Sequence, residues 1–409
     1  MFAITRRLEE LSDVRVDLND VAAGDGCLFV RDGIGLAGRG VAARLDLDGA
    51  VDVLRSIEHD TSVEEHGPVA IGVVPFRPGS PAKAVLAEVT VRKSMEHSPT
   101  ITAVGGDVEA ASAHLDDAVR WIAERSSSDA VTVTASSYTI EPAVATEQYL
   151  AAVVAARDAT RSGNIVKAVI ARPIVVTADR PIDVHAVLRR LRATFGSSYR
   201  YSIDGFIGAS PELLVEVDGA IVRSHPLAGT APRTGDADND ARIAAELIAS
   251  TKNQLEHRVV IDVVHDTLLP WSSYLDWEPE PSIVTVANVQ HLGTRLEGML
   301  SQPGPSVVEL VRALCPTPAL GGHPRAEAIE LIERVEGFDR GRYGGAVGWV
   351  DASGNGTWAV AIRCAELSPD RCSARLVAGG GIVADSDPAS ELAETQAKFQ
   401  AMLSAIIRP

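Results

Sequence analysis

The sequence is poor in cysteine and in aromatic residues, and it contains no long apolar run. Its four cysteines, Cys27, Cys315, Cys364 and Cys372, match no spacing of a zinc site, so we interpret them as reduced thiols of a cytosolic protein. No stretch approaches the about 18 apolar residues of a membrane span, and the amino-terminal residues lack the apolar core of a signal peptide. We therefore expect a cytoplasmic protein without membrane contact.

Positive charge is also scarce. The chain has 38 Lys and Arg against 55 Asp and Glu, which gives a formal net charge of −17. No basic stripe offsets this charge, so a nucleic-acid partner is disfavoured. An anionic substrate would need local cations or a metal ion in such a protein. The hydrophobic fraction of 46% is enough for a substantial core.

The pattern of predicted elements lacks the regular alternation and the Gly-x-Gly-x-x-Gly fingerprint of a dinucleotide-binding fold. Strand patterns occur at 27–30, 69–74, 166–171, 199–207, 213–217, 282–286, 345–350, 357–363 and 373–377. Helical patterns occur at 109–124, at 146–161 with Thr146 as cap, after Pro181, from Ser250 or Thr251 onward, and after Asp387-Pro388. We expect an α+β fold in which helices flank large antiparallel β-sheets, forming one domain over residues 1–409. The polar segment 126–129 is predicted to be a loop and not a domain boundary.

A few charged side chains stand out from these patterns, namely Lys167, Glu212, Glu256, Arg363, Glu391, Glu394 and Lys398. Lys167 interrupts an apolar strand, and Arg363 follows an apolar run that we interpret as a buried strand. The last three share one helix face at positions i, i+3 and i+7. Taken singly, most of these residues are typical of surface or salt-bridged positions, whereas a buried arginine usually has an anionic partner.

Ten short motifs in unbroken order change this interpretation. They lie at 165–172, 209–214, 226–233, 252–257, 290–292, 316–322, 340–345, 361–363, 379–383 and 391–395. Together they resemble the chorismate-utilising enzymes, which comprise isochorismate, salicylate, anthranilate and aminodeoxychorismate synthases. The resemblance covers residues 145–405, the catalytic part, and residues 1–140 form a divergent amino-terminal part. It implies the single chorismate-binding domain of anthranilate synthase component I.

Two positions distinguish the branches of this family. Lys167 stands where water-using branches carry lysine and ammonia-using branches carry glutamine, and Ala228 stands where the aminodeoxychorismate branch carries a lysine. The chain thus resembles isochorismate and salicylate synthases, which need no amidotransferase subunit. The 316–322 segment favours isochorismate synthase, although Cys315 replaces a histidine of many relatives. Salicylate synthase is the nearest alternative, followed by an anthranilate synthase large subunit and a non-catalytic chorismate-binding protein.

The reaction implied by the resemblance adds water at C2 of chorismate and removes the C4 hydroxyl. Water needs a base to accept its proton, and hydroxide needs an acid in order to leave. The resemblance makes Lys167 the base and Glu212 the acid. A free lysine amine has a pKa of about 10.4, so a lysine that acts as a base must be kept neutral by burial. The apolar strand around Lys167 is consistent with this requirement.

The resemblance also implies a Mg²⁺ site and a substrate pocket. Glu256 and Glu394 are expected to bind Mg²⁺, with support from Glu391, because this ion prefers oxygen ligands. Arg363 is expected to form a bidentate pair with the second substrate carboxylate. The other expected substrate contacts are Thr230, His291, Ala319, Tyr343, Gly380, Gly381 and Lys398. All motifs belong to one subunit, so we expect a monomer.

Overall fold

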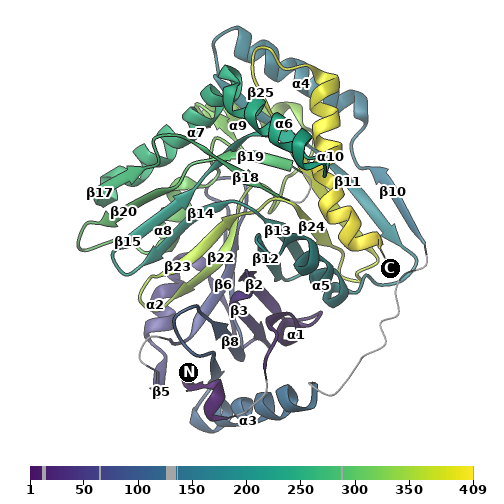
Figure 1. Cartoon of the computed structure of the whole chain (residues 1–409). Helices are drawn as coiled ribbons and strands as arrows, with labels where there is room; N and C mark the ends of the chain where they lie inside the picture. The colour runs from purple at the N-terminus through teal and green to yellow at the C-terminus, as the bar shows by residue number, and fades with distance from the viewer. Residues whose placement is uncertain (12–14, 64–65, 126–134, 136, 287–288, 409) are drawn as a thin grey trace.

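The computed structural model describes residues 1–11, 15–63, 66–125, 135, 137–286 and 289–408. The predicted loop at 126–129 lies outside these residues. Within them the chain forms the expected α+β fold, with two large, almost entirely antiparallel sheets and helices around them (Figure 1). None of the helices in the described ranges is long and apolar enough to cross a membrane.

The larger sheet has thirteen strands among the described residues. In spatial order they are β10 (Tyr138–Pro142), β11 (Lys167–Ala178), β25 (Ser373–Ile382), β24 (Cys364–Leu367), β13 (Phe206–Ser210), β12 (Tyr199–Ile203), β2 (Cys27–Arg31), β3 (Ile34–Arg39), β8 (Val89–Lys93), β9 (Thr100–Gly105), β1 (Phe2–Arg7) and β5 (Glu58–Thr61), with β21 (Gly322–His323) paired to β11. Because β12 pairs with β2, amino-terminal strands continue the sheet that carries the motif-bearing strands.

The second sheet has nine strands in the same described ranges. Their order is β17 (Ser272–Trp277), β20 (Leu296–Leu300), β15 (Ile221–His225), β14 (Leu213–Asp218), β23 (Gly356–Val360), β22 (Ala346–Asp351), β6 (Val69–Val74), β7 (Lys83–Leu86) and β4 (Ala43–Asp46). A small third sheet contains β16 (Leu227–Pro232), β19 (Val289–Gly293) and β18 (Ser282–Thr285).

The helices are α1 (Leu18–Ala22), α2 (Ala50–Arg55), α3 (Val108–Arg125), α4 (Thr146–Arg161), α5 (Val184–Phe195), α6 (Ala237–Ala249), α7 (Thr251–Leu268), α8 (Val307–Leu314), α9 (Arg325–Val335) and α10 (Pro388–Ile407). Figure 1 shows α4, α6, α7 and α9 at the end of the sheets opposite α3, and α10 beside β11 and β10. The two longest helices of the catalytic part, α7 and α10, begin at the predicted caps. Ser250 accepts from the Asn253 N–H, and Asp387 accepts from the Ser390 N–H.

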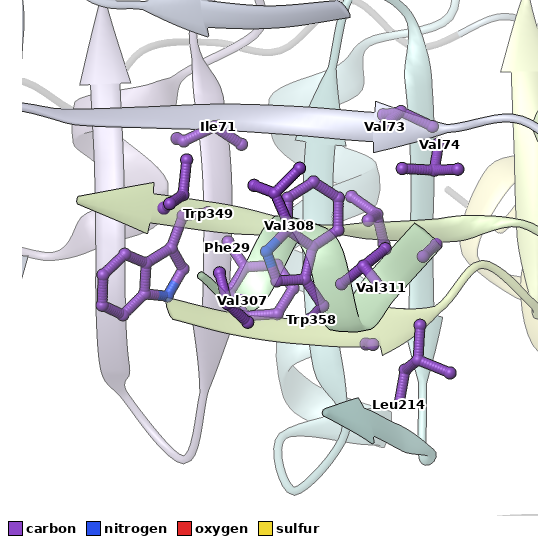
Figure 2. Packing of buried hydrophobic residues seen from close by; sticks show 14 of the residues in the cluster. Phe29, Ile71, Val73, Val74, Leu214, Val307, Val308, Val311, Trp349 and Trp358 are labelled. Atoms are coloured by element: carbon purple, nitrogen blue, oxygen red, sulfur yellow. The ribbon is translucent and has the colours of Figure 1, made fainter. Parts of the chain in front are cut away.

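A hydrophobic core joins the two large sheets and α8. The rings of Phe29 and Trp358 come from different sheets, and the valines of α8 pack beside them (Figure 2). Trp358 is completely buried. Burial of large aromatic side chains supplies much of the hydrophobic stabilisation of such a core. This packing gives the strands that carry the functional residues a rigid base.

Several local predictions were wrong, for physical reasons. Ala145, not Thr146, occupies the N-cap position of α4, where it makes no side-chain capping hydrogen bond, because Thr146 is already helical. The predicted strand at 357–363 ends at Val360, and Arg363 follows with a φ of 51°, which a strand cannot contain. The glycines at 379–381 lie inside β25 and not after it.

Candidate active site

One cavity of about 250 Å³ lies between the ends of β11 and β25, the small third sheet and helices α7 and α10. It is lined by Val169, Glu212, Leu227, Ala228, Gly229, Thr230, Lys252, Asn253, Glu256, His291, Ala319, Leu320, Tyr343, Ile362, Arg363, Gly379, Gly381, Glu391, Glu394 and Lys398. All the residues predicted for the site therefore line it except Lys167 and Gly380. Their roles remain predictions, but the structure brings them together from distant parts of the sequence.

Lys167 lies directly behind the cavity wall. It is not an edge or surface lysine, because β11 is flanked there by β25 and β21 and the lysine is 3% exposed. Its Nζ donates to Glu256 Oε1 at 2.7 Å. A carboxylate at this distance stabilises the ammonium form. A base must present an unprotonated amine to the attacking water, so the role predicted for Lys167 requires that this contact with Glu256 be broken.

Gly381 leaves the space in which this ion pair forms. A Cβ placed on Gly381 would lie 2.6 Å from Lys167 Cε and 2.8 Å from Glu256 Oε1. Any larger residue would displace one of the two side chains. The sequence predicts that Gly381 contacts the substrate, and the structure shows in addition why a side chain is excluded at this position.

Glu212 lies in the turn between β13 and β14 and is 3% exposed. Its carboxylate accepts a long hydrogen bond of 3.4 Å from the Leu227 N–H. Burial raises the pKa of Glu212 to about 7, although this hydrogen bond and the charges of Arg363 and Lys167 oppose the shift. Near neutral pH this carboxyl group is therefore protonated in a large fraction of molecules, as a general acid requires.

The face of α10 places two more carboxylates at the cavity. Lys398 Nζ lies 2.5 Å from Glu394 Oε1 and donates to Gly379 O at 2.7 Å. Burial raises the pKa of Glu394, but the charge and hydrogen bond of Lys398, together with the charges of Arg363 and Lys167, outweigh burial and lower the pKa below its usual value. Burial and the charge of Glu394 raise the pKa of Glu391 to about 7. The three side chains thus form one charged cluster.

These carboxylates suit a magnesium ion that is shared with an anionic ligand. Gly380 leaves room for these carboxylates, since a Cβ there would lie 2.6 Å from Glu391 Oε2 and 3.7 Å from Glu394 Oε1. Glu256 reaches the same cavity from α7. In the described residues no three acidic, histidine or cysteine side chains gather closely enough to enclose a metal. Mg²⁺ commonly uses one or two carboxylates together with water or substrate oxygens, so the donor set fits an open site.

Arg363 provides a half-buried cation that lines the cavity. Its Nη2 lies 3.4 Å from His291 Nε2, and His291 Nδ1 lies 3.0 Å from Thr230 Oγ1. A guanidinium can only donate, so Nε2 accepts and the imidazole is neutral with its proton on Nδ1. Burial, aided by the charges of Arg363 and Lys398, also holds the pKa of His291 well below its usual value. Burial raises the pKa of Tyr343 to about 12, so its phenol remains protonated.

Sequence reasoning missed Lys252 and Asn253, which line the cavity from the first turn of α7. Both lie in the 252–257 motif, and Lys252 is one helical turn before Glu256. Because Lys252 and Glu256 are four residues apart, they lie on the same face of a helix, and this spacing could have placed Lys252 at the site. The exposed ammonium of Lys252 partly offsets the rise in the pKa of Glu391. Lys252 is therefore a third cation of the cavity lining, in addition to Arg363 and Lys398.

Comparisons with known proteins agree with this geometry. The family model described as "Chorismate binding enzyme" matches residues 54–407. A Mycobacterium tuberculosis protein provisionally named isochorismate synthase MenF is 44% identical over 271 residues, which cover 63% of this chain and 73% of that protein. The vibriobactin-specific isochorismate synthase of Vibrio cholerae is 35% identical over 83% of this chain and 79% of its own. The structure of MenF, the menaquinone-specific isochorismate synthase of Escherichia coli, shares this fold with a TM-score of 0.82 at 24% identity and covers 99% of this chain and 94% of its own.

Proposed function

Because the chain belongs to the chorismate-binding enzyme family, we propose that it is an isochorismate synthase that adds water to chorismate at C2 and removes the C4 hydroxyl. The observation that carries this proposal is that Glu212, a buried carboxyl whose pKa is raised to about 7, lines the cavity, and that the buried Lys167 lies directly behind the cavity wall. Several relatives that share 35–44% identity with the chain are named isochorismate synthases. The geometry of the site and the comparisons therefore support the same activity.

The two proposed catalytic residues divide the proton transfers between them. Lys167, in its neutral amine form, accepts a proton from the attacking water, and Glu212 donates a proton to the departing C4 oxygen. The proton gained by Lys167 then returns through solvent to Glu212, which restores both groups. One water is consumed and one is released, so the overall reaction is an isomerisation. The raised pKa of Glu212 suits its role because an acid works best with a pKa near the working pH.

The remaining charged groups bind and orient the dianionic substrate. Arg363 receives one carboxylate, and the neutral His291 fixes the guanidinium and Thr230 in place. Mg²⁺ would be bound by Glu256 and Glu394, with Glu391 beside them, and would neutralise the ring carboxylate when bound. Lys398 keeps Glu394 ionised and oriented before any cation arrives. We also propose that the enzyme acts in the cytoplasm as a monomer without an amidotransferase subunit, in menaquinone or siderophore synthesis.

The product formed from chorismate tests this function. Enzyme, chorismate and Mg²⁺ are incubated near neutral pH, and early products are separated by chromatography. Isochorismate as the main early product is expected. Salicylate would indicate that pyruvate is eliminated in the same site, and anthranilate formed with ammonia would show that position 167 was misinterpreted. If chorismate disappeared no faster than in a control without enzyme, the chain would be a non-catalytic chorismate-binding protein.

The pH dependence of kcat/KM follows from the Glu212 carboxyl. Burial raises its pKa to about 7, so the required protonated form is complete on the acid side and is lost as the pH rises through that value. We expect kcat/KM for chorismate to fall on the alkaline side of pH 7, since this parameter reports groups of the free enzyme. A steady-state profile that stays flat there would contradict the assignment.

Replacing Glu256 with glutamine tests the proposed metal ligand. The change removes the negative charge of one oxygen donor, which is also the partner of Lys167, with little change of volume. We expect the Mg²⁺ concentration for half-maximal activity and the KM for chorismate both to rise, by at least about tenfold. The rise in Tm caused by Mg²⁺ with chorismate should also shrink, which is a readout independent of turnover.

Glu246→Gln is the matched control for this substitution, because Glu246 is an exposed glutamate of α6 that pairs with Arg242. It should behave as wild type in both assays. If Glu256→Gln kept the Mg²⁺ dependence and KM of wild type, Glu256 would not be a ligand.

A further inference from the structure

A buried ion pair lies behind the cavity wall without lining it. Glu336 directly follows α9, Arg340 comes four residues later, and their side chains are 1% and 2% exposed. The Arg340 guanidinium binds both carboxylate oxygens of Glu336, since Nε donates to Oε2 at 2.8 Å and Nη2 donates to Oε1. Burying two charges is costly unless they are paired and their other hydrogen-bonding groups are satisfied. The further partners of this pair therefore indicate its purpose.

The pair fills a gap along one edge of β11. On the side opposite β25, β11 pairs with β21 over residues 167–168 and with β10 over residues 174–178. Between these stretches, the Ala171 N–H donates to the buried carboxylate at 2.7 Å, and the guanidinium donates to Val169 O at 2.6 Å. The two side chains thus satisfy backbone groups that a neighbouring strand would otherwise pair. This segment begins two residues after Lys167.

The same guanidinium reaches two further walls of the cavity. Its Nη1 donates to Leu320 O at 2.8 Å, in the loop that also carries Ala319. It lies 4.2 Å from the centroid of the Phe76 ring and 6.0 Å from that of Tyr343. Leu320, Ala319 and Tyr343 all line the cavity. One buried cation therefore connects the strand of the proposed base, the loop at 319–320 and the tyrosine segment.

We propose that Glu336 and Arg340 are positioning residues for the reaction. They lie outside the cavity lining, and they set the relative placement of three cavity walls that come from β11, from the loop before β21 and from the segment after Arg340. The proposal rests on the proposed function. Displacing reacting groups by about 1 Å can cost on the order of 100-fold in rate. Loss of the pair should therefore affect kcat more than substrate binding.

The test compares Arg340→Lys and Glu336→Gln with wild type, at a temperature well below the Tm of each protein. Arg340→Lys keeps the charge but loses the fork that reaches Val169, Leu320 and Glu336 together. Glu336→Gln keeps the size but places an amide opposite the guanidinium. For each variant we expect kcat for chorismate, per folded molecule, to fall roughly 10- to 100-fold. The KM should change much less.

Arg312→Ala is the matched control. Arg312 makes a bidentate pair with Asp48 and donates to Ser80 O, but these groups lie away from the cavity lining. This variant should lose thermal stability and keep kcat. The proposal is overturned if both Arg340→Lys and Glu336→Gln turn over at the wild-type kcat per folded molecule, or if Arg312→Ala loses kcat to the same extent. An inactive wild-type enzyme in the same assay would instead overturn the proposed function.

Discussion

Replacing Lys167 with glutamine is expected to lower kcat for isochorismate formation by about 10³-fold while chorismate still binds. The amide cannot accept a proton from water, so the general base is lost. The side chain lies behind the cavity lining, in contact with Glu256, so substrate contacts are largely kept. Steady-state rates would be measured by product chromatography, and binding by calorimetry.

A second substitution separates the role of the base from the role of the charge. Lys167→Arg retains a cation beside Glu256 but cannot be deprotonated at working pH. If Lys167 is the base, the arginine variant should be as inactive as the glutamine variant. Recovery of activity in Lys167→Arg, or wild-type kcat in Lys167→Gln, would limit Lys167 to balancing the charge of Glu256. Lys83→Gln, an exposed lysine of β7, serves as the control and should be unchanged.

Replacing Glu212 with glutamine is expected to lower kcat by about 10²- to 10⁴-fold. The amide oxygen can still accept from the Leu227 N–H, so the turn keeps its shape, but the amide cannot protonate the departing hydroxyl. The fall of kcat/KM on the alkaline side of pH 7 should disappear from the residual activity. Both effects are read from the same pH-dependent rate measurements.

Glu216→Gln is the matched control, because Glu216 lies four residues further along the chain and pairs with Arg223 outside the cavity lining. Its kcat and pH profile should match those of wild type. A Glu212→Gln enzyme with an unchanged profile would show that another group supplies the proton.

Local signals in the sequence predicted the elements well where the physical cause is itself local. Ser250 caps α7, and Asp387-Pro388 begins α10, as predicted, because capping depends on residues within one turn. The α+β class with large antiparallel sheets was also confirmed. Boundaries failed where tertiary structure decided them. Arg363 leaves the strand to enter the cavity, and the glycines at 379–381 extend β25 because β11 pairs with them.

The order of the motifs predicted which residues would meet, but not how they would contact one another. Lys167 and Glu256 are 89 positions apart, and no local pattern shows that they form an ion pair. Glu336 and Arg340 have the spacing of an ordinary helical salt bridge, so the sequence gives no indication that they are buried against β11. Such contacts depend on the packing of the whole fold. The roles of the individual site residues remain predictions until the variants are measured.

Carrying out the reaction in water enriched in ¹⁸O would test the central chemistry most directly. If an amine at position 167 activates solvent and a carboxyl at position 212 expels the original hydroxyl, newly formed isochorismate must carry one solvent oxygen at C2. Mass spectrometry of the early product should then show a full single-label shift, and recovered chorismate should stay unlabelled at the earliest times. Isochorismate without the label would mean that the hydroxyl migrates within the molecule, and the proposed pair of proton-transfer groups would be wrong.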